Sequence, residues 1–291
     1  MADGSGSTAG AHGVRLGRAV PRGAGAWVPP VTPRLRLTLL GVGAMNSPRY
    51  PPAGLLVRYR RRQVMLDGGP GAEPAGPLAA WLVCDERSEL RRELRALGAA
   101  RGLHPAVAAI SIADLVIEPR PVTHTSHLTW GYLLRLPTAS AVWAPEIWAF
   151  PAWAAGADLM FADAAGWNRP IRFARGAGGH MAALQVAEQA REHRVTRLVF
   201  AHIGRPSLRA IDAGYRPPFG EWGQPGRTYQ LPPQTHDAAR HARVIGAAPS
   251  SSHPGRARIG PLCAPAVASR LWPGRYVRCL ARVHFCAHHG R

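Results

Sequence analysis

The sequence of 291 residues contains no lysine, so all 36 of its basic residues are arginines. Acidic residues are also scarce, at 17, and the formal net charge is +19 at pH 7. Such an excess can attract nucleic acid or anionic lipid, but much of it lies near the C-terminus. Residues 236–291 alone hold nine arginines and one aspartate. The middle of the chain is only moderately basic, so we do not expect a nucleic-acid partner.

Cysteines and long apolar runs are scarce as well. Three of the four cysteines lie after residue 260, which argues against a disulfide framework and favours a reducing compartment. No apolar run approaches the roughly 18 residues that span a bilayer, and the first 30 residues lack the continuous apolar core of a secretory signal. These absences predict a cytoplasmic protein with no membrane partner. They do not define its oligomeric state.

The patterns that are present divide the chain into three parts. Residues 1–34 are rich in Gly, Ala and Pro without apolar periodicity, which is typical of a flexible leader. From residue 236 onwards the strand and helix periods disappear, which predicts a basic, disordered tail over 236–291. One folded domain is therefore expected over residues 35–235.

Strands and helices alternate within this domain. The apolar periods predict two helices, at residues 88–97 and 181–192. Period-two and short apolar runs predict a β-rich stretch over 111–136 and separate strands at 35–40, 54–59, 63–67, 80–84 and 197–201. Strands followed by a helix, twice over, are typical of a layered α/β domain.

Three histidines are predicted to follow strands, namely His124, His180 and His202. Strand ends in α/β proteins meet at one edge of the sheet, where ligands usually bind. A neutral imidazole is also the commonest metal ligand. One such histidine is most simply a structural residue, but three of them, with carboxylates in Asp67, Glu146 and Asp163, predict a shared site.

Several short motifs also occur in a fixed order along the domain. They are the glycine turn 41–43, the hairpin 54–67 with its Asp-Gly loop, Pro121–His124 before Gly131-Tyr132, the strand 157–163, His180, and the strand that bears His202. Together these motifs resemble the metallo-β-lactamase-fold hydrolases, and most nearly the RNase Z-like branch, which processes tRNA 3′ ends. The resemblance covers about residues 35–210 and implies an α/β fold, a four-layer αββα sandwich.

One motif departs from that family. The metal-binding motif HxHxDH should follow the strand at 80–84, where this chain has DERSEL at residues 85–90. Arg87 stands in the register of a histidine, and a guanidinium has no lone pair to offer a metal. Leu90 removes another ligand outright. The motif is degenerate, and a normal two-zinc site is not expected.

The remaining residues are still compatible with a smaller site. The resemblance implies metal ligation by His124, His202 and Glu146, with Asp85 or Glu89 as further oxygen ligands, and catalytic roles for His180 and Asp163. Two histidines with a carboxylate suit one divalent ion, with zinc as the first candidate and manganese or iron as others. Candidate substrate-binding residues are Arg205, Arg87 and His127. We expect Arg87 to point towards solvent.

Two functions follow from this set. The first is a divergent hydrolase that acts on a phosphoester or ester of a small molecule through a single metal-activated water. The second is a metal-free relative that binds a small anionic or aromatic ligand without catalysis. The second function would use Arg87, Arg205 and an aromatic wall of tryptophans: Trp143, Trp148, Trp153 and Trp167.

Overall fold

The computed structural model describes residues 33–174 and 178–231. The expectations of a leader over 1–34 and a tail over 236–291 fall almost wholly outside these residues. None of the helices in the described ranges is long and apolar enough to cross a membrane.

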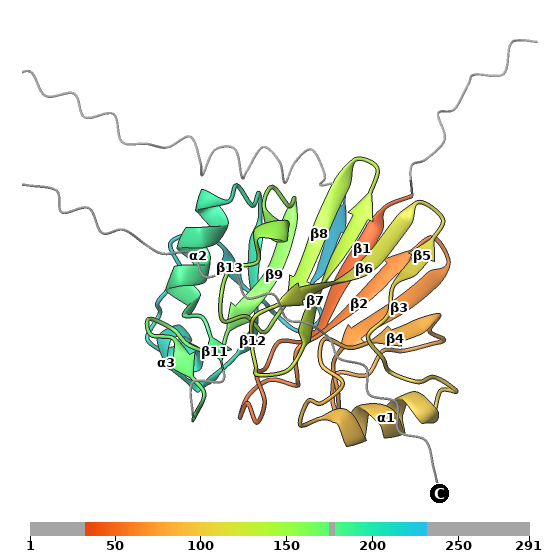
Figure 1. The fold of residues 1–291 in the computed structure, drawn as a ribbon, viewed down its shortest axis with the longest axis horizontal. Helices are drawn as coiled ribbons and strands as arrows, with labels where there is room; N and C mark the ends of the chain where they lie inside the picture. The colour runs from red at the N-terminus through yellow and green to blue at the C-terminus, as the bar shows by residue number, and fades with distance from the viewer. Residues whose placement is uncertain (1–32, 175–177, 232–291) are drawn as a thin grey trace, which may run out of the picture. The chain divides into compact units, whose positions relative to one another are not determined.

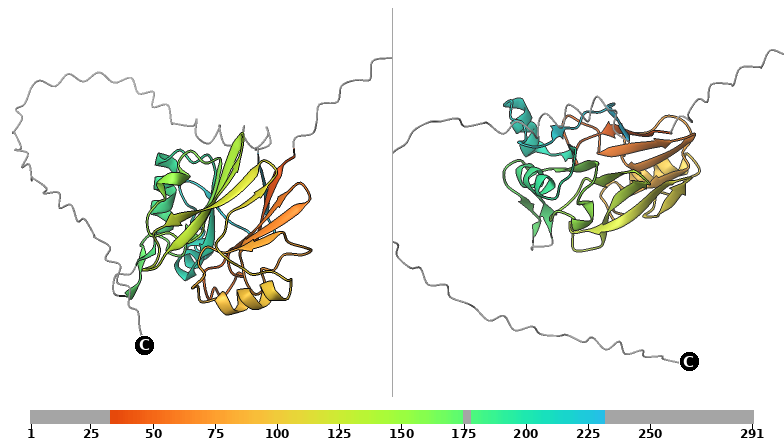
Figure 2. Two further views of the ribbon diagram at one scale, coloured as in Figure 1. Left: turned by 45° about the vertical axis from the view of Figure 1, so that its right-hand side comes forward. Right: turned by 90° about the horizontal axis from the view of Figure 1, so that it is seen from above.

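Two β-sheets form the centre of the domain (Figures 1 and 2). The first sheet has the strand order β14-β1-β2-β3-β4. Its strands are β1 (Leu35–Gly41), β2 (Gly54–Tyr59), β3 (Arg62–Asp67), β4 (Ala80–Leu82) and β14 (Thr228–Leu231). The last strand, β14, pairs antiparallel with β1, so the two ends of the domain close the same sheet.

The second sheet has the order β13-β12-β9-β8-β7-β6-β5. Its strands are β5 (Ile110–Ile112), β6 (Leu115–Val122), β7 (Thr129–Leu136), β8 (Ala139–Ala144), β9 (Leu159–Ala164), β12 (Leu198–Ile203) and β13 (Glu221–Trp222). A separate two-stranded ribbon joins β10 (Ile171–Arg172) to β11 (Gly179–His180). The helical elements are α1 (Arg91–Ala99), the short 3₁₀ helix η1 (Ala152–Ala154), α2 (Ala183–Glu192) and α3 (Arg205–Asp212).

The alternation of side chains along β2 shows how the layers form. Leu55 and Val57 point into the main core between the two sheets, whereas Leu56 points to the opposite face. There Leu56 joins Met65, Trp81 and Leu94, so α1 covers the outer face of the first sheet. Complete burial of an apolar side chain such as Leu94 contributes roughly 2 kcal/mol, which explains why a helix with so many arginines docks here.

The second helical layer covers the outer face of the second sheet. The small buried face of α2, comprising Ala183, Val186, Ala187 and Ala190, packs against β9 and β12. Figure 1 shows α2 and α3 together at this side of the molecule, away from α1. Helix, sheet, sheet and helix give the four layers that the resemblance implies.

Several boundaries differ from the sequence-based prediction. The helix expected at 88–97 begins at Arg91, because residues 86–90 form turns. The strand expected to end before His202 continues through it to Ile203. The pairing of β12 with β9 shifts at this point, since Ala201 faces Asp163 and Ile203 faces Ala164. His202 is therefore the extra residue of a β-bulge, which redirects its side chain.

Candidate functional site

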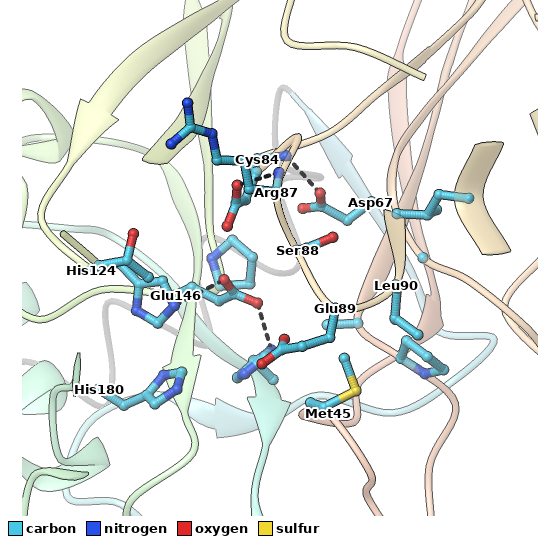
Figure 3. A pocket seen from close by; sticks show the side chains of 18 of the residues that line it. Met45, Asp67, Cys84, Arg87, Ser88, Glu89, Leu90, His124, Glu146 and His180 are labelled. Carbon is cyan, nitrogen blue, oxygen red and sulfur yellow. Dashed lines mark hydrogen bonds and ion pairs between the residues drawn. The ribbon is translucent and has the colours of Figure 1, made fainter. Parts of the chain in front are cut away.

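A cavity of about 340 Å³ opens where loops from both sheets meet (Figure 3). Its wall is formed by the turn after β1, the end of β3, the segment 85–90, the β6–β7 loop, the end of β8, β11 and β12. Most of the predicted site residues line it: Asp85, Arg87, Glu89, His124, His127, Glu146, His180 and His202. Asp163 lies directly behind His180, and Arg205 is not part of the lining.

Glu146 is the centre of the polar half of this cavity. One of its carboxylate oxygens lies 3.2 Å from Nε2 of His124, and the other lies 3.5 Å from Nδ1 of His202. Figure 3 shows the carboxylate directed towards His124. Two histidines that are 78 residues apart in the sequence thus share one carboxylate, as the shared-site hypothesis requires.

The pKa values of the two histidines in this cluster shift in opposite directions. Burial opposes a charge on His124, but the hydrogen bond to Glu146, the charges of Glu146 and Asp163 and the Gly179 carbonyl together outweigh it and raise the pKa of His124 to about 9. Burial also dominates at His202 and lowers its pKa, so this ring is neutral at pH 7. Burial would raise the pKa of Glu146, but the attraction of His202 and the hydrogen bond from His124 hold it far below its usual range.

Two glycines make the position of His124 possible. The backbone N–H of Gly179 donates to the carbonyl of His124 at 2.8 Å, and Nδ1 of His124 lies 3.0 Å from the carbonyl of Gly179. A Cβ on Gly178 would lie 1.9 Å from the carbonyl oxygen of His124, and φ at Gly178 is +113°. Only glycine fits such a close approach. The Gly179 carbonyl accepts the proton on Nδ1, so Nε2 is the nitrogen that bonds Glu146 and whose proton an ion would displace.

His180 and Asp163 form a second pair. Asp163 is completely buried, and one of its oxygens lies 2.8 Å from Nδ1 of His180. The carboxylate also accepts the backbone N–H groups of Ile147 and Ala165. Burial opposes a charge on His180, but Asp163 raises its pKa. Nε2 of His180 has no hydrogen-bond partner among the described residues.

The imidazole rings form a compact group, in which His202 stacks on His180 and His124 is tilted against His180. The centroid of His180 lies 4.7 Å from that of His124 and 5.1 Å from that of His202. Phe173 packs edge-on against both His124 and His180, at 5.2 Å and 5.3 Å. The aromatic ring shields this side of the group from water and strengthens the electrostatic interactions within it.

The segment 85–90, in the register of the missing HxHxDH motif, is held by a different pair. Both oxygens of Asp85 lie about 3 Å from Nε2 of His127, at 3.0 and 2.9 Å, and Oδ1 also accepts the backbone N–H of Arg87. Asp85, a predicted metal ligand, thus has its carboxylate engaged by His127, a predicted substrate-binding residue. Within the described ranges, the exposed side chains of Arg87 and Glu89 make no ion pair. The Arg87 guanidinium points away from Glu146 (Figure 3).

Asp67 has a role that the sequence reasoning missed. It ends β3 with φ of +51°, and its carboxylate accepts the backbone N–H of Cys84 at 2.7 Å and the indole N–H of Trp143 at 2.6 Å. Desolvation raises the pKa of Asp67 to about 6, against these hydrogen bonds. Burial likewise raises the pKa of the Cys84 thiol well above its usual value. Asp67 therefore ties the end of β3 to the segment after β4 and to β8, at the wall of the cavity.

The tryptophans do not form an aromatic wall. Trp143 is buried in the core, Trp148 stacks under Arg172, Trp153 donates to the carbonyl of Pro121, and Trp167 stacks with Tyr215. None of the four lines the cavity described here. The apolar part of its wall comes instead from residues that the sequence did not single out, including Met45, Leu94 and Phe173.

The donor chemistry of the His124–Glu146–His202 cluster fits a divalent ion. Two imidazoles and one carboxylate are ligands that zinc accepts. The Gly179 carbonyl engages Nδ1 of His124, so this residue would bind an ion through Nε2 after losing the proton there. Over the described ranges, no three His, Cys, Asp or Glu side chains are already arranged as they would be around an ion. In this arrangement the histidines and Glu146 interact with one another instead.

Comparison with solved structures identifies the fold. The metallo-β-lactamase fold protein YhfI from Bacillus subtilis aligns with a TM-score of 0.53 and 12% identity, over 68% of this chain and 100% of that chain. Human tRNase Z, short form (ELAC1), aligns with a TM-score of 0.52 and 13% identity, over 68% and 99%. A diphosphatase from the PhnP family aligns with a TM-score of 0.50 and 16% identity, over 68% and 97%.

No family model and no curated protein matches the sequence. At these identities the structural likenesses establish the fold alone, and the predicted metallo-β-lactamase-like sandwich is confirmed.

Proposed function

We propose that this metallo-β-lactamase-fold protein is a hydrolase of a small-molecule ester or phosphoester that uses one divalent ion, with zinc as the first candidate. The ion would be held by His124, Glu146 and His202. The observation that carries the proposal is the single carboxylate shared by two histidines from distant segments, at 3.2 and 3.5 Å. Asp85 is left out of the ligand set because its carboxylate is engaged by His127.

The chain's own residues would prepare the reaction. An ion in this cluster, when bound, would lower the pKa of a water molecule and polarise the bond to be cleaved. Asp163 holds a proton on Nδ1 of His180, so Nε2 is the atom that exchanges a proton with the reactant. Phe173 limits the access of bulk water to the imidazole rings. The catalytic assignments of His180 and Asp163 thus rest on their hydrogen bond.

The metal-free binding function has less support. An anionic ligand would need cationic side chains in the cavity, but the protonated His124 is already paired with Glu146. Arg205 is not part of the lining, and the exposed Arg87 points away from Glu146. An aromatic ligand would need the tryptophans, which pack elsewhere. The cavity instead contains carboxylates and histidines, which suit a cation.

The test is an assay of full-length protein purified without a histidine tag. After removal of metal by a chelator, hydrolysis of p-nitrophenyl esters and phosphoesters should be absent and should return with zinc or manganese. Glu146→Gln should lower kcat/KM by at least about 100-fold, the upper range for residues that support a metal site. Glu188→Gln, on the exposed face of α2 and away from the cavity, is the control and should leave the rate unchanged. Full activity without metal, or in Glu146→Gln, would reject the proposal.

A further inference from the structure

The cavity has two chemically different halves. The histidines and Glu146 form one half, and Met45, Pro52, Leu90 and Leu94 belong to the other. Figure 3 shows Met45 and Leu90 across the cavity from His124 and His180. Leu90 also packs on the apolar cluster beneath α1 that contains Leu94, so its position is fixed by the core. We call Met45, Pro52, Leu90 and Leu94 the apolar wall.

Gly69 lets Leu90 and Pro52 pack closely against the backbone. A Cβ built on Gly69 would lie 3.3 Å from Cδ1 of Leu90 and 3.3 Å from Cγ of Pro52. The same glycine has φ of +145°, which side chains rarely adopt. Leu90 and Pro52 therefore converge on a glycine backbone, which holds both side chains at this side of the cavity.

The charges in the lining disfavour an anionic substrate. Four carboxylates belong to the wall, from Asp67, Asp85, Glu89 and Glu146, whereas its cationic side chains are Arg87 and the protonated His124, whose proton a bound ion would displace. Arg87 is exposed and points away from Glu146. Recognition of a phosphate relies on cationic donors directed at its oxygens, and Arg87 supplies none in this position. An uncharged substrate avoids this repulsion.

We propose that the substrate is an uncharged carboxylic ester of a small molecule, with an apolar acyl group seated against the apolar wall. This inference rests on the proposed hydrolase function and chooses between its two substrate classes. In the reaction, the oxygen of water bonds to the acyl carbon and the acyl–oxygen bond breaks, its electron pair going to the alcohol oxygen. The alcohol leaves with a proton from Nε2 of His180, which regains a proton from the attacking water.

The first experiment compares rates along a series of esters. With zinc-loaded full-length protein, kcat/KM should rise about fourfold for each methylene added from p-nitrophenyl acetate to butyrate, as expected for burial of a CH₂ group. p-Nitrophenyl phosphate and bis(p-nitrophenyl) phosphate should react at least 100-fold more slowly than the butyrate ester. Leu90→Asn, which keeps the size but not the apolar character, should remove the dependence on acyl length. Leu128→Asn is the matched control, because Leu128 is 74% exposed and does not line the cavity.

The second experiment measures binding without catalysis. Calorimetric titration with N-butylbutanamide, an uncleaved analogue of the ester, should detect binding to the wild type and at least tenfold weaker binding to Leu90→Asn. Equal melting temperatures for the variant and the wild type would exclude unfolding as the cause.

If the amide binds in this pattern and neither substrate class is cleaved, the apolar wall is supported and the hydrolase function is rejected. Three results would overturn the inference: faster cleavage of phosphoesters, a rate that does not change with acyl length, or equal amide binding by Leu90→Asn and the wild type. If cleavage is observed in any of these cases, the hydrolase function itself is still supported. An absence of both binding and cleavage would reject both.

Discussion

Buried carboxylates determine where the imidazoles of the site lie. Asp163 has a donor on each of its oxygens, from the backbone of Ala165 on one side and from Ile147 and His180 on the other. An asparagine cannot replace this carboxylate without loss, because its amide nitrogen, in the place of either oxygen, would face an N–H donor and leave that donor unpaired. The sequence indicates Asp163 as a site residue, but only the structure shows that its role is to hold His180.

Asp163→Asn should therefore lower the free energy of unfolding by about 2–4 kcal/mol. This is the range expected when a buried hydrogen bond to a charged group is lost and a second donor is left unpaired. Urea denaturation measures this change. Asp158→Asn is the comparison, since Asp158 accepts a single backbone N–H, from Ser140, in a partly buried turn, and should lose about 1 kcal/mol. Equal losses in the two variants would mean that Asp163 is no more than a loop-anchoring residue.

The raised pKa of Asp67 makes the free energy of unfolding depend on pH in a defined direction. Its folded-state pKa of about 6 lies above the ordinary value of 3.8, so folding takes up a proton between these two pH values. The contribution of Asp67 to stability is then highest below pH 4 and falls as the pH rises to 6, by roughly 3 kcal/mol. Carbon-13 NMR titration of labelled aspartates should show one carboxyl with a midpoint near 6. A set of aspartates that all titrate near pH 4 would contradict this account.

At the scale of elements, the segment 85–90 shows what a sequence pattern can predict and what it cannot. Its register against the HxHxDH motif correctly locates it at the cavity. The prediction that a helix begins at residue 88 is wrong, because turns precede α1 and present Asp85 to His127. That pairing joins residues 42 positions apart, and no local pattern encodes it. Within the described residues, the Asp85–His127 pair supplies a link that fixes the segment on the β6–β7 loop.

Arg87→His tests the role of this segment. Because the guanidinium is exposed and points away from Glu146, solvent screens its charge from the proposed ion site. We expect the zinc affinity of Arg87→His to differ from the wild type by less than about threefold, since an exposed charge contributes less than about 1 kcal/mol. Arg91→His, at the exposed start of α1, is the matched control for added histidine. Tightening by tenfold or more in Arg87→His alone would show that Arg87 opposes the ion.

Strand β12 shows a second limit of sequence reasoning. Its apolar run predicts a buried strand, and the structure confirms one. The bulge at His202, with φ of +54°, is not visible in the sequence because it depends on the register with β9. Helix α3 was missed as well, since eight residues with Pro206 near the start give too short an apolar period to recognise.

At the scale of the whole molecule, the layered fold was predictable and the chemistry of the cavity only in part. Periods of two and 3.6 residues, with the order of the motifs, were sufficient to predict two sheets flanked by helices. The histidines were predicted to meet because strand ends converge at one sheet edge. The apolar wall was not predicted, because Met45 comes from a segment without a periodic signal and meets Leu90 only in the folded chain.

The central claim, that His124, Glu146 and His202 together hold one divalent ion, is tested most directly by calorimetric titration of metal-free, untagged full-length protein with zinc. We predict one ion per chain for the wild type and for His104→Ala, whose histidine is exposed and outside the cavity. We predict at least 100-fold weaker binding for His202→Ala, because one of three ligands is lost. Equal zinc binding by His202→Ala and the wild type, or no stoichiometric binding by the wild type, would contradict the account.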